Sequence, residues 1–204
     1  RTPGSGNGRV LADSGAVSAG RRRPLVEGLD VVGGVGRVGE VGRRSVAVGA
    51  VVDVRVEAVG VYSRSGEGLH RFHDPVDDRT YLYTQYEPAD SRRVMACFEQ
   101  PDMKAEYTFV VDAPSGWEVL SNQSPAHVDL GVGVQRVQFA PTLPLSSYIT
   151  AVAAGPYARV DGEWSRDDQQ IALGVFVRRS LVEHLEADEI LDITRQGLDF
   201  FTDA

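Results

Sequence analysis

The sequence has few of the residues that would build a disulfide-stabilised or membrane-spanning protein. Among its 204 residues there is one cysteine, Cys97, so no disulfide can form within the chain. The apolar neighbours Met95 and Phe98 favour a buried, inert thiol over a reactive one. The sequence contains no run of about 18 apolar residues and no signal-peptide pattern at its N-terminus. These absences predict a cytoplasmic protein.

Positive charge is also scarce. The 21 lysines and arginines are outnumbered by 29 aspartates and glutamates, which gives a net charge of −8. This balance argues against nucleic acids and anionic membrane surfaces as partners. The hydrophobic fraction of 42% and the charged fraction of 25% are typical of a soluble globular protein that can bury a sizeable core.

The first 60 residues lack aromatic side chains altogether, and Gly, Val and Arg make up more than half of them. This composition predicts an atypical segment, poorly ordered or built of degraded strands. The alternating valines from Val46 to Val56 favour a strand or two within it. Its Gly-x-Gly pairs, such as Gly34 and Gly36, follow no clear strand, which favours a flexible segment over a phosphate-binding loop.

From Tyr62 onward the pattern is that of an antiparallel β protein. The central strand is expected over residues 81–86, which are rich in Tyr and Thr. A short helix is expected over residues 91–98. Further strands are predicted over residues 106–111, 117–121, 135–140, 146–154 and 171–178, and turns over residues 74–78, 112–116 and 122–125.

The character of the sequence changes at Ser180. Ser180 and Glu183 have the spacing of a capping box, and apolar residues then recur at helical spacing as far as Phe201. We therefore expect a helix over residues 180–201 that begins a second domain and is cut off at Ala204. The predicted organisation is an atypical segment (1–60), a β-rich domain (61–178) and the start of another domain (179–204).

One polar pair stands out as a candidate binding site. Gln85 and Glu87 are two residues apart and so lie on the same face of an extended chain. A surface glutamate on an edge strand is the simpler interpretation of Glu87. The pair His70 and His73 suggests a metal site, but two histidines with no third ligand nearby are more often loop residues.

Five strings, taken together and in this order, carry a family resemblance. They are GEGLHRFHDP (66–75), YLYTQYEPADSRRVMACFEQPDMKAEYTF (81–109), VLSNQSP (119–125), FAPTLPLSSYITAVAAGPY (139–157) and SLVEHLEADEILDITRQGLDFF (180–201). They resemble the N-terminal domain of aminopeptidase N-type zinc metallopeptidases, in the actinobacterial-like form of that family of gluzincin peptidases.

The resemblance implies a mainly β fold. The expected architecture is a saddle-shaped antiparallel β domain, followed by the first helix of a truncated α+β thermolysin-like domain. In such enzymes the β domain forms one wall of the substrate cleft. The family's T-Q-x-E string falls on Gln85 and Glu87, so Glu87 would bind the free α-amino group of a peptide and Gln85 would help to position it.

The catalytic groups of the family are missing from this sequence. It contains neither the zinc motif H-E-x-x-H nor the G-x-M-E-N exopeptidase loop. The resemblance therefore implies zinc in a full-length enzyme of peptide catabolism, with no metal ligand and no catalytic residue among these 204 residues. The chain alone is expected to be inactive on its peptide substrates.

Two further alternatives bear on this interpretation. A non-catalytic β-rich protein-binding module would also account for the strands, but such a module has no need to end inside an amphipathic helix. Residues 1–60 depart from the family pattern of inward Tyr, Phe and Leu. They resemble the product of a displaced reading frame that rejoins the true frame just before Tyr62.

Overall fold

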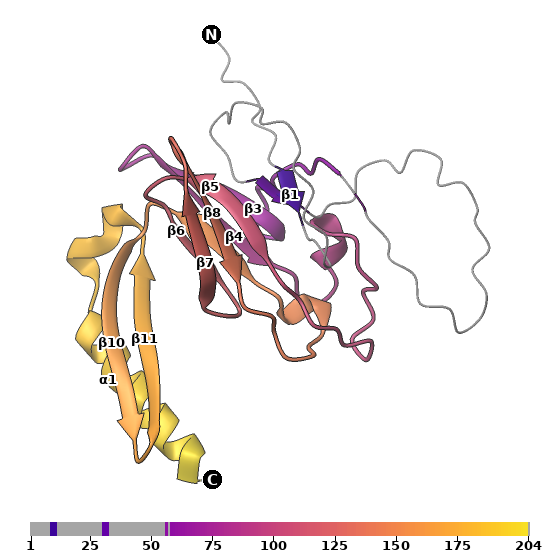
Figure 1. Cartoon of the computed structure of the whole chain (residues 1–204). Coiled ribbons are helices and arrows are strands. Elements are labelled where there is room, and N and C mark those ends of the chain that lie inside the picture. Colours follow the sequence, from indigo (N-terminus) through magenta and orange to yellow (C-terminus); the bar gives the residue numbers. More distant parts are fainter. Residues whose placement is uncertain (1–8, 12–29, 33–55, 57, 204) are drawn as a thin grey trace. The chain divides into compact units, whose positions relative to one another are not determined.

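The computed structural model describes residues 9–11, 30–32, 56 and 58–203 (Figure 1). The strands expected among Val46 to Val56 lie almost entirely outside the described residues, and so do the Gly-x-Gly pairs. The strands and the flexible segment expected at those glycines therefore stay predictions. Contacts divide the chain into two compact units. Unit 1 comprises Arg1–Phe72 and Leu82–Gly155, and unit 2 comprises His73–Tyr81 and Pro156–Ala204. The domain boundaries expected from the sequence stay predictions.

Two mostly antiparallel sheets organise unit 1, and two of their strands extend into residues 73–81 of unit 2. The five-stranded sheet has the order β1-β2-β5-β8-β7, in which only β1 and β2 are parallel. Its strands are β1 (Arg9–Leu11), β2 (Asp30–Val32), β5 (Val110–Pro114), β8 (Val134–Phe139) and β7 (Pro125–Leu130). The four-stranded sheet, in the order β3-β4-β9-β6, contains β3 (Gly68–Asp74), β4 (Arg79–Gln85), β9 (Val152–Gly155) and β6 (Glu118–Ser121).

Both sheets contribute to one hydrophobic core. Burial alternates along β8, where Val137 and Phe139 are buried and Arg136 and Gln138 are exposed. Val111 and Ala113 of β5 are fully buried in the same cluster, as is Ala154 of β9. This period-two pattern is what a strand with one face on the core requires. The mainly antiparallel β fold class predicted from the sequence is thus confirmed.

Several predicted boundaries within unit 1 were wrong. The strand expected over residues 106–111 begins at Val110 and runs through part of the predicted turn, because Ala113 and Pro114 pair with β8. Strand β7 was not predicted at all.

The long strand expected over residues 146–154 is also wrong. It is a 3₁₀ turn, η2 (Ser147–Ile149), followed by the shorter β9. Here the Ser146 hydroxyl donates to the Pro101 carbonyl (2.5 Å) and the Thr150 hydroxyl to that of Ser147 (2.7 Å). These hydroxyls bond to nearby backbone groups, which favours a turn over a ladder.

Unit 2 is built on a long hairpin and a helix. Strands β10 (Ala158–Arg166) and β11 (Gln169–Val177) pair along their whole length, and helix α1 (Ala187–Asp203) lies beside them (Figure 1). Leu191 of α1 is buried over Gly162, where a Cβ would come within 2.8 Å of its side chain. Glycine at this position therefore allows the helix to approach the hairpin closely.

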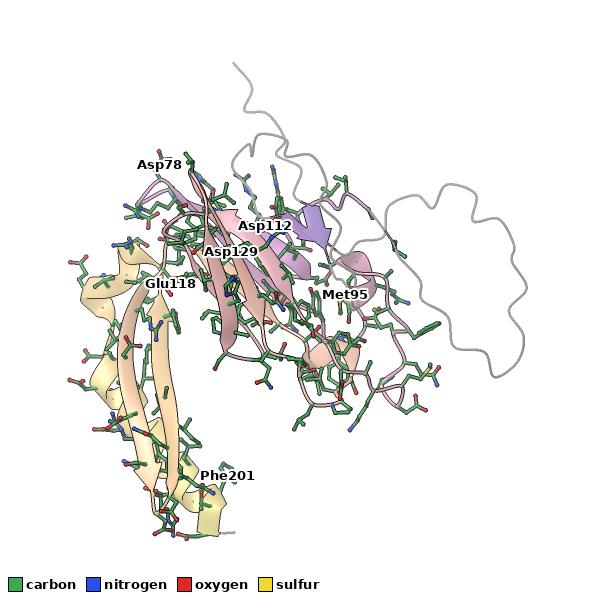
Figure 2. The ribbon with its side chains drawn as sticks, viewed as in Figure 1. Asp78, Met95, Asp112, Glu118, Asp129 and Phe201 are labelled. Carbon is green, nitrogen blue, oxygen red and sulfur yellow. The ribbon has the colours of Figure 1, made fainter. Side chains whose placement is uncertain are left out.

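Helix α1 keeps apolar residues on its exposed surface as well. Phe201, near its C-terminal end (Figure 2), is 77% exposed, and its ring centroid lies 5.3 Å from that of Phe200. Asp188 and Glu189 occupy the first turn, where negative charge complements the helix dipole. None of the described helices has the length and apolar character that crossing a membrane would require.

The predicted helix over residues 180–201 was wrong in its first part. Residues Arg179–His184 form a 3₁₀ helix, η3, and α1 begins only at Ala187. Ser180 does not cap a helix, because its hydroxyl donates instead to Oδ2 of the buried Asp74 (2.6 Å). The same oxygen accepts from Arg178 Nη1 (2.5 Å), so the start of this segment is held by a carboxylate that lies far away in the sequence.

Candidate functional site

The candidate site lies where β4 ends. Gln85 is the last residue of the strand, and Tyr86 and Glu87 continue the chain beyond it. Tyr86 is 3% exposed, whereas Gln85 and Glu87 on either side of it are exposed. Glu87 opens the turn that follows the strand, and Gln85 and Glu87 both reach solvent on either side of the buried Tyr86. That the two side chains share one face and act together stays a prediction.

The backbone around this pair is fixed on both sides. Before it, Thr84 Oγ1 accepts a hydrogen bond from the Val152 N–H of β9 (2.8 Å). After it, the Asp90 N–H donates to the Tyr86 carbonyl (2.7 Å) and closes a turn that contains the cis Glu87–Pro88 peptide bond. Burial raises the pKa of Tyr86 far above its usual value, so its phenol is a neutral anchor in the core.

The side chains of the pair have no partner in the part of the chain that the structure describes. Within residues 58–203, neither the Gln85 nor the Glu87 side chain has a hydrogen bond or an ion pair with another described residue. An exposed carboxylate and an exposed amide on a fixed backbone can accept hydrogen bonds from a ligand without first breaking bonds within the protein.

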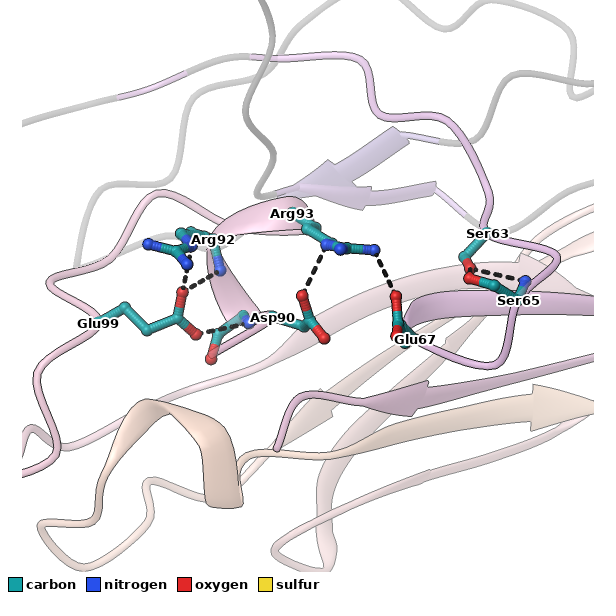
Figure 3. Close-up of polar contacts among 8 residues, drawn as sticks. Ser63, Ser65, Glu67, Asp90, Arg92, Arg93 and Glu99 are labelled. Atoms are coloured by element: carbon teal, nitrogen blue, oxygen red, sulfur yellow. Dashed lines mark hydrogen bonds and ion pairs between the residues drawn. The ribbon is translucent and has the colours of Figure 1, made fainter. Parts of the chain in front are cut away.

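The arginines that follow in the sequence do not neutralise Glu87. They lie on a 3₁₀ turn, η1 (Ser91–Arg93), where Arg93 bridges Asp90 (2.6 Å) and Glu67 (2.8 Å), as Figure 3 shows. Arg92 pairs with Glu99 (3.2 Å). Because each guanidinium already has a carboxylate partner, the charge on Glu87 is left for a cation from outside this cluster.

The same cluster explains why the helix expected over residues 91–98 is only one turn long. The Glu99 carboxylate accepts from the backbone N–H groups of Ser91 (2.7 Å) and Arg92 (3.2 Å), which are the free donors at the start of a helix. At a rise of about 1.5 Å per residue, a helix from Ser91 to Phe98 would carry Glu99 about 12 Å away from these donors. The chain must turn back for this contact to form, so the prediction was wrong in the length of the helix.

Tyr83 is a site neighbour that the sequence argument missed. It lies two residues before Gln85 and is 40% exposed, with its ring centroid 5.0 Å from that of His70. The available signal was the same two-residue spacing that singled out Gln85 and Glu87. An exposed aromatic ring beside the polar pair can pack against an apolar part of a ligand.

The histidines proposed as a metal pair have other partners. His70 Nδ1 accepts from the Gly66 N–H (3.0 Å), and His73 Nε2 lies 3.0 Å from Asp78 Oδ1. Over the part of the chain that the structure describes, no three His, Cys, Asp or Glu side chains are grouped as metal ligands would be. These residues therefore do not fit the three-ligand site that a catalytic zinc requires.

The single cysteine is half-buried. Burial and the nearby Glu99 carboxylate raise the pKa of the Cys97 thiol, which keeps it protonated and unreactive at neutral pH. Elsewhere in unit 1 an open hollow of about 550 Å³ is lined by residues that include Ser63, Arg64 and Arg93 but neither Gln85 nor Glu87.

Comparison with known proteins decides the family. Residues 44–149, just over half of the chain, match the peptidase M1 N-terminal domain. The chain belongs to the M1 peptidase family. The resemblance to an actinobacterial-like aminopeptidase N is confirmed by 51% identity over 148 residues to an aminopeptidase N of Streptomyces lividans.

Two other M1 relatives are more distant. A probable M1 family aminopeptidase 1 of Encephalitozoon cuniculi is 31% identical over 150 residues, and aminopeptidase M1-A of Oryza sativa subsp. japonica is 30% identical over 98 residues. The three matches cover 72%, 72% and 46% of this chain, but only 17%, 16% and 11% of the respective relatives. The chain thus spans less than a fifth of the length of these M1 proteins.

Proposed function

We propose that this chain is the part of a zinc-dependent M1 aminopeptidase that forms one wall of the substrate cleft and binds the α-amine of the peptide. The family assignment and the names of the relatives support the aminopeptidase class. The site is supported by the exposed Glu87 carboxylate, which has no partner among the described residues and lies on a backbone held by the buried Tyr86. The substrates are peptides with a free N-terminus.

Charge and geometry assign the roles within the pair. Glu87 accepts hydrogen bonds from the substrate ammonium, a charge-assisted contact that contributes roughly 1.5–3 kcal/mol. Gln85, which has both a donor and an acceptor, orients the first residue of the peptide. A carboxylate at this position discriminates against chains whose amine is blocked or internal, which is the selectivity that an exopeptidase needs.

Peptide hydrolysis itself requires groups outside this chain. In enzymes of this class zinc polarises the attacking water and the scissile carbonyl. Since no ligand set for zinc is found among the described residues and the sequence lacks H-E-x-x-H, no catalytic step is assigned to this chain. Its place is peptide catabolism in the cytoplasm, as one part of a larger enzyme.

A first test is to read the gene past the codon for Ala204. If a zinc domain follows the cleft wall, an H-E-x-x-H motif should occur in frame about a hundred residues downstream. Finding that motif would support the proposal. A stop codon directly after Ala204 favours the alternative of a non-catalytic β-rich protein-binding module.

A kinetic test uses a chain extended through that zinc domain. Glu87→Gln keeps the shape of the side chain but removes its charge, so kcat/KM for free-amine peptides should fall about 10- to 150-fold, chiefly through KM. Glu106→Gln removes one exposed carboxylate from the same unit and should leave kcat/KM unchanged. Equal values of kcat/KM for Glu87→Gln and the parent enzyme would show that Glu87 does not bind the substrate amine.

A further inference from the structure

Strand β7 lies at an open edge of the five-stranded sheet. It pairs with β8 on one side, and none of the described strands pairs with its other side. All six of its residues, Pro125–Leu130, are exposed. An exposed strand edge presents a row of unpaired N–H and C=O groups on which another strand can assemble.

The hairpin register shows which backbone groups face outward. The Gly131 N–H donates to the Val134 carbonyl (2.7 Å), which makes that pair a hydrogen-bonded one. Hydrogen-bonded and non-hydrogen-bonded pairs alternate along an antiparallel ladder. Asp129 opposite Arg136 is therefore a bonded pair, and Val128 opposite Val137 is not. The N–H and C=O of Val128 consequently point away from β8.

The side chains of β7 are complementary to a second copy of the same strand. When two copies run antiparallel with Val128 opposite Val128, His127 of each lies opposite Asp129 of the other. Within one chain these two side chains already lie 2.8 Å apart on one face of β7 (Asp129 is labelled in Figure 2). On the other face Val128, 45% exposed, meets its own copy.

We propose that two copies of this chain associate through β7 in this two-fold antiparallel register, which joins their five-stranded sheets into one continuous sheet. Backbone pairing, hydrogen bonding between His127 and Asp129, and apolar contact at Val128 all agree on the same register, as an isologous interface requires. Pro125, which has no N–H, and the irregularity between Pro125 and His127 end the pairing on one side, and the turn after Leu130 ends it on the other. The interface is therefore short and the association weak.

Cross-linking tests the register directly. Val128→Cys, made in a Cys97→Ser chain, places two thiols across the two-fold axis, where the Cα atoms of a bonded antiparallel pair are about 5.5 Å apart. That spacing suits a disulfide. Val132→Cys is the matched control, since Val132 is fully exposed but lies in the turn outside the paired register. We expect a covalent dimer from Val128→Cys alone; equal cross-linking of both variants, or none in either, overturns the proposal.

Sedimentation velocity on the full chain, at concentrations up to about 1 mM, tests the association itself. The parent chain should dimerise, and Val128→Lys should raise the dimer Kd by at least about tenfold, because two lysines then face each other. Val132→Lys, the same change outside the register, should leave the dimer Kd unchanged. Circular dichroism confirms that each variant is folded, as expected for exposed sites. A parent chain that stays monomeric throughout, or a dimer insensitive to Val128→Lys, contradicts the proposal.

Discussion

The two units of this chain are stabilised in different ways. Unit 1 contains a cluster of thirteen buried apolar residues drawn from both of its sheets. Among the described residues of unit 2, only Tyr81, Trp164 and Leu191 are buried apolar side chains. A single hairpin and a single helix provide few layers in which to bury more.

Polar contacts take a larger share in unit 2. The indole N–H of Trp164 donates to Asp199 of α1 (2.9 Å), and Arg166 forms an ion pair with Asp203. Asp74 holds Arg178 and Ser180, as described above. The lesson is that the Gln85–Glu87 site belongs to the unit with the larger core, where its backbone is held by buried neighbours. The two tryptophans, Trp117 in unit 1 and Trp164 in unit 2, report on the unfolding of the two units separately.

The largest effect is expected in the core of unit 1. Phe139 is 2% exposed, so Phe139→Ala leaves a cavity and should reduce the free energy of unfolding by about 3–5 kcal/mol. Urea unfolding followed by Trp117 fluorescence, in a Trp164→Phe background, measures the change. Leu143→Ala, at a site 79% exposed, is the control and should change it little. Similar losses from the two substitutions would contradict the idea of a core around Phe139.

A smaller loss is expected for the apolar contact of unit 2. Leu191→Ala should cost about 2 kcal/mol, the low end for a buried leucine, because this side chain has few buried apolar neighbours. Gly162→Ala should cost about 1 kcal/mol, because its Cβ would lie 2.8 Å from Leu191 Cδ2.

The two changes are coupled through the same space. With Leu191 shortened, the added methyl group no longer meets it, so the double variant should lose less than the sum of the single losses. Trp164 fluorescence in a Trp117→Phe background measures all three variants. Strict additivity would show that Gly162 and Leu191 do not share this contact.

The smallest effect concerns the pH dependence of unit 2. Hydrogen bonds from Ser180 and the Val76 N–H, together with the charge of Arg178, hold the pKa of Asp74 below its usual value of 3.8. A lowered pKa in the folded state means that the carboxylate stabilises the fold above pH 3.8, and that this contribution is lost as the pH falls through the lowered pKa.

Acid unfolding of unit 2, followed by Trp164, should therefore become less dependent on pH below about 4 in Asp74→Asn, which cannot ionise. The variant should also be less stable than the parent at neutral pH. Asp168→Asn, at an exposed turn carboxylate, should keep the parent profile. An Asp74→Asn profile with the same acid limb as the parent would assign the pH dependence to other groups.

The strands of this protein were predictable where β-branched and aromatic residues gather between turn signals. Such segments located β4, β6, β8 and β11 to within a few residues, although among these four strands burial alternates regularly only along β8. Strand β7 was not, because all of its residues are exposed and it shows no buried face. The 3₁₀ turn at Ser147 and the delayed start of α1 after Ser180 depend on tertiary hydrogen bonds. The hydroxyl of Ser146 donates to Pro101 and that of Ser180 to Asp74, and both partners lie far away in the sequence.

The candidate site was predictable in its residues but not in its surroundings. The spacing of Gln85 and Glu87 predicts a shared face, and the family resemblance gives the pair a role. Sequence alone did not show that Arg92 and Arg93 are engaged by Glu99, Asp90 and Glu67, because those pairings depend on how the loop folds. That engagement is what leaves the Glu87 charge available.

The central claim is a direct contact between Glu87 and a substrate ammonium, and a thermodynamic cycle measures it. A peptide inhibitor and its analogue without the α-amine are each bound by the zinc-domain-extended protein and by its Glu87→Gln variant. We expect a coupling energy of roughly 1.5–3 kcal/mol between the amine and Glu87, and a value near zero in the same cycle with Glu106→Gln. A coupling energy near zero for Glu87 would mean that Glu87 does not contact the substrate ammonium.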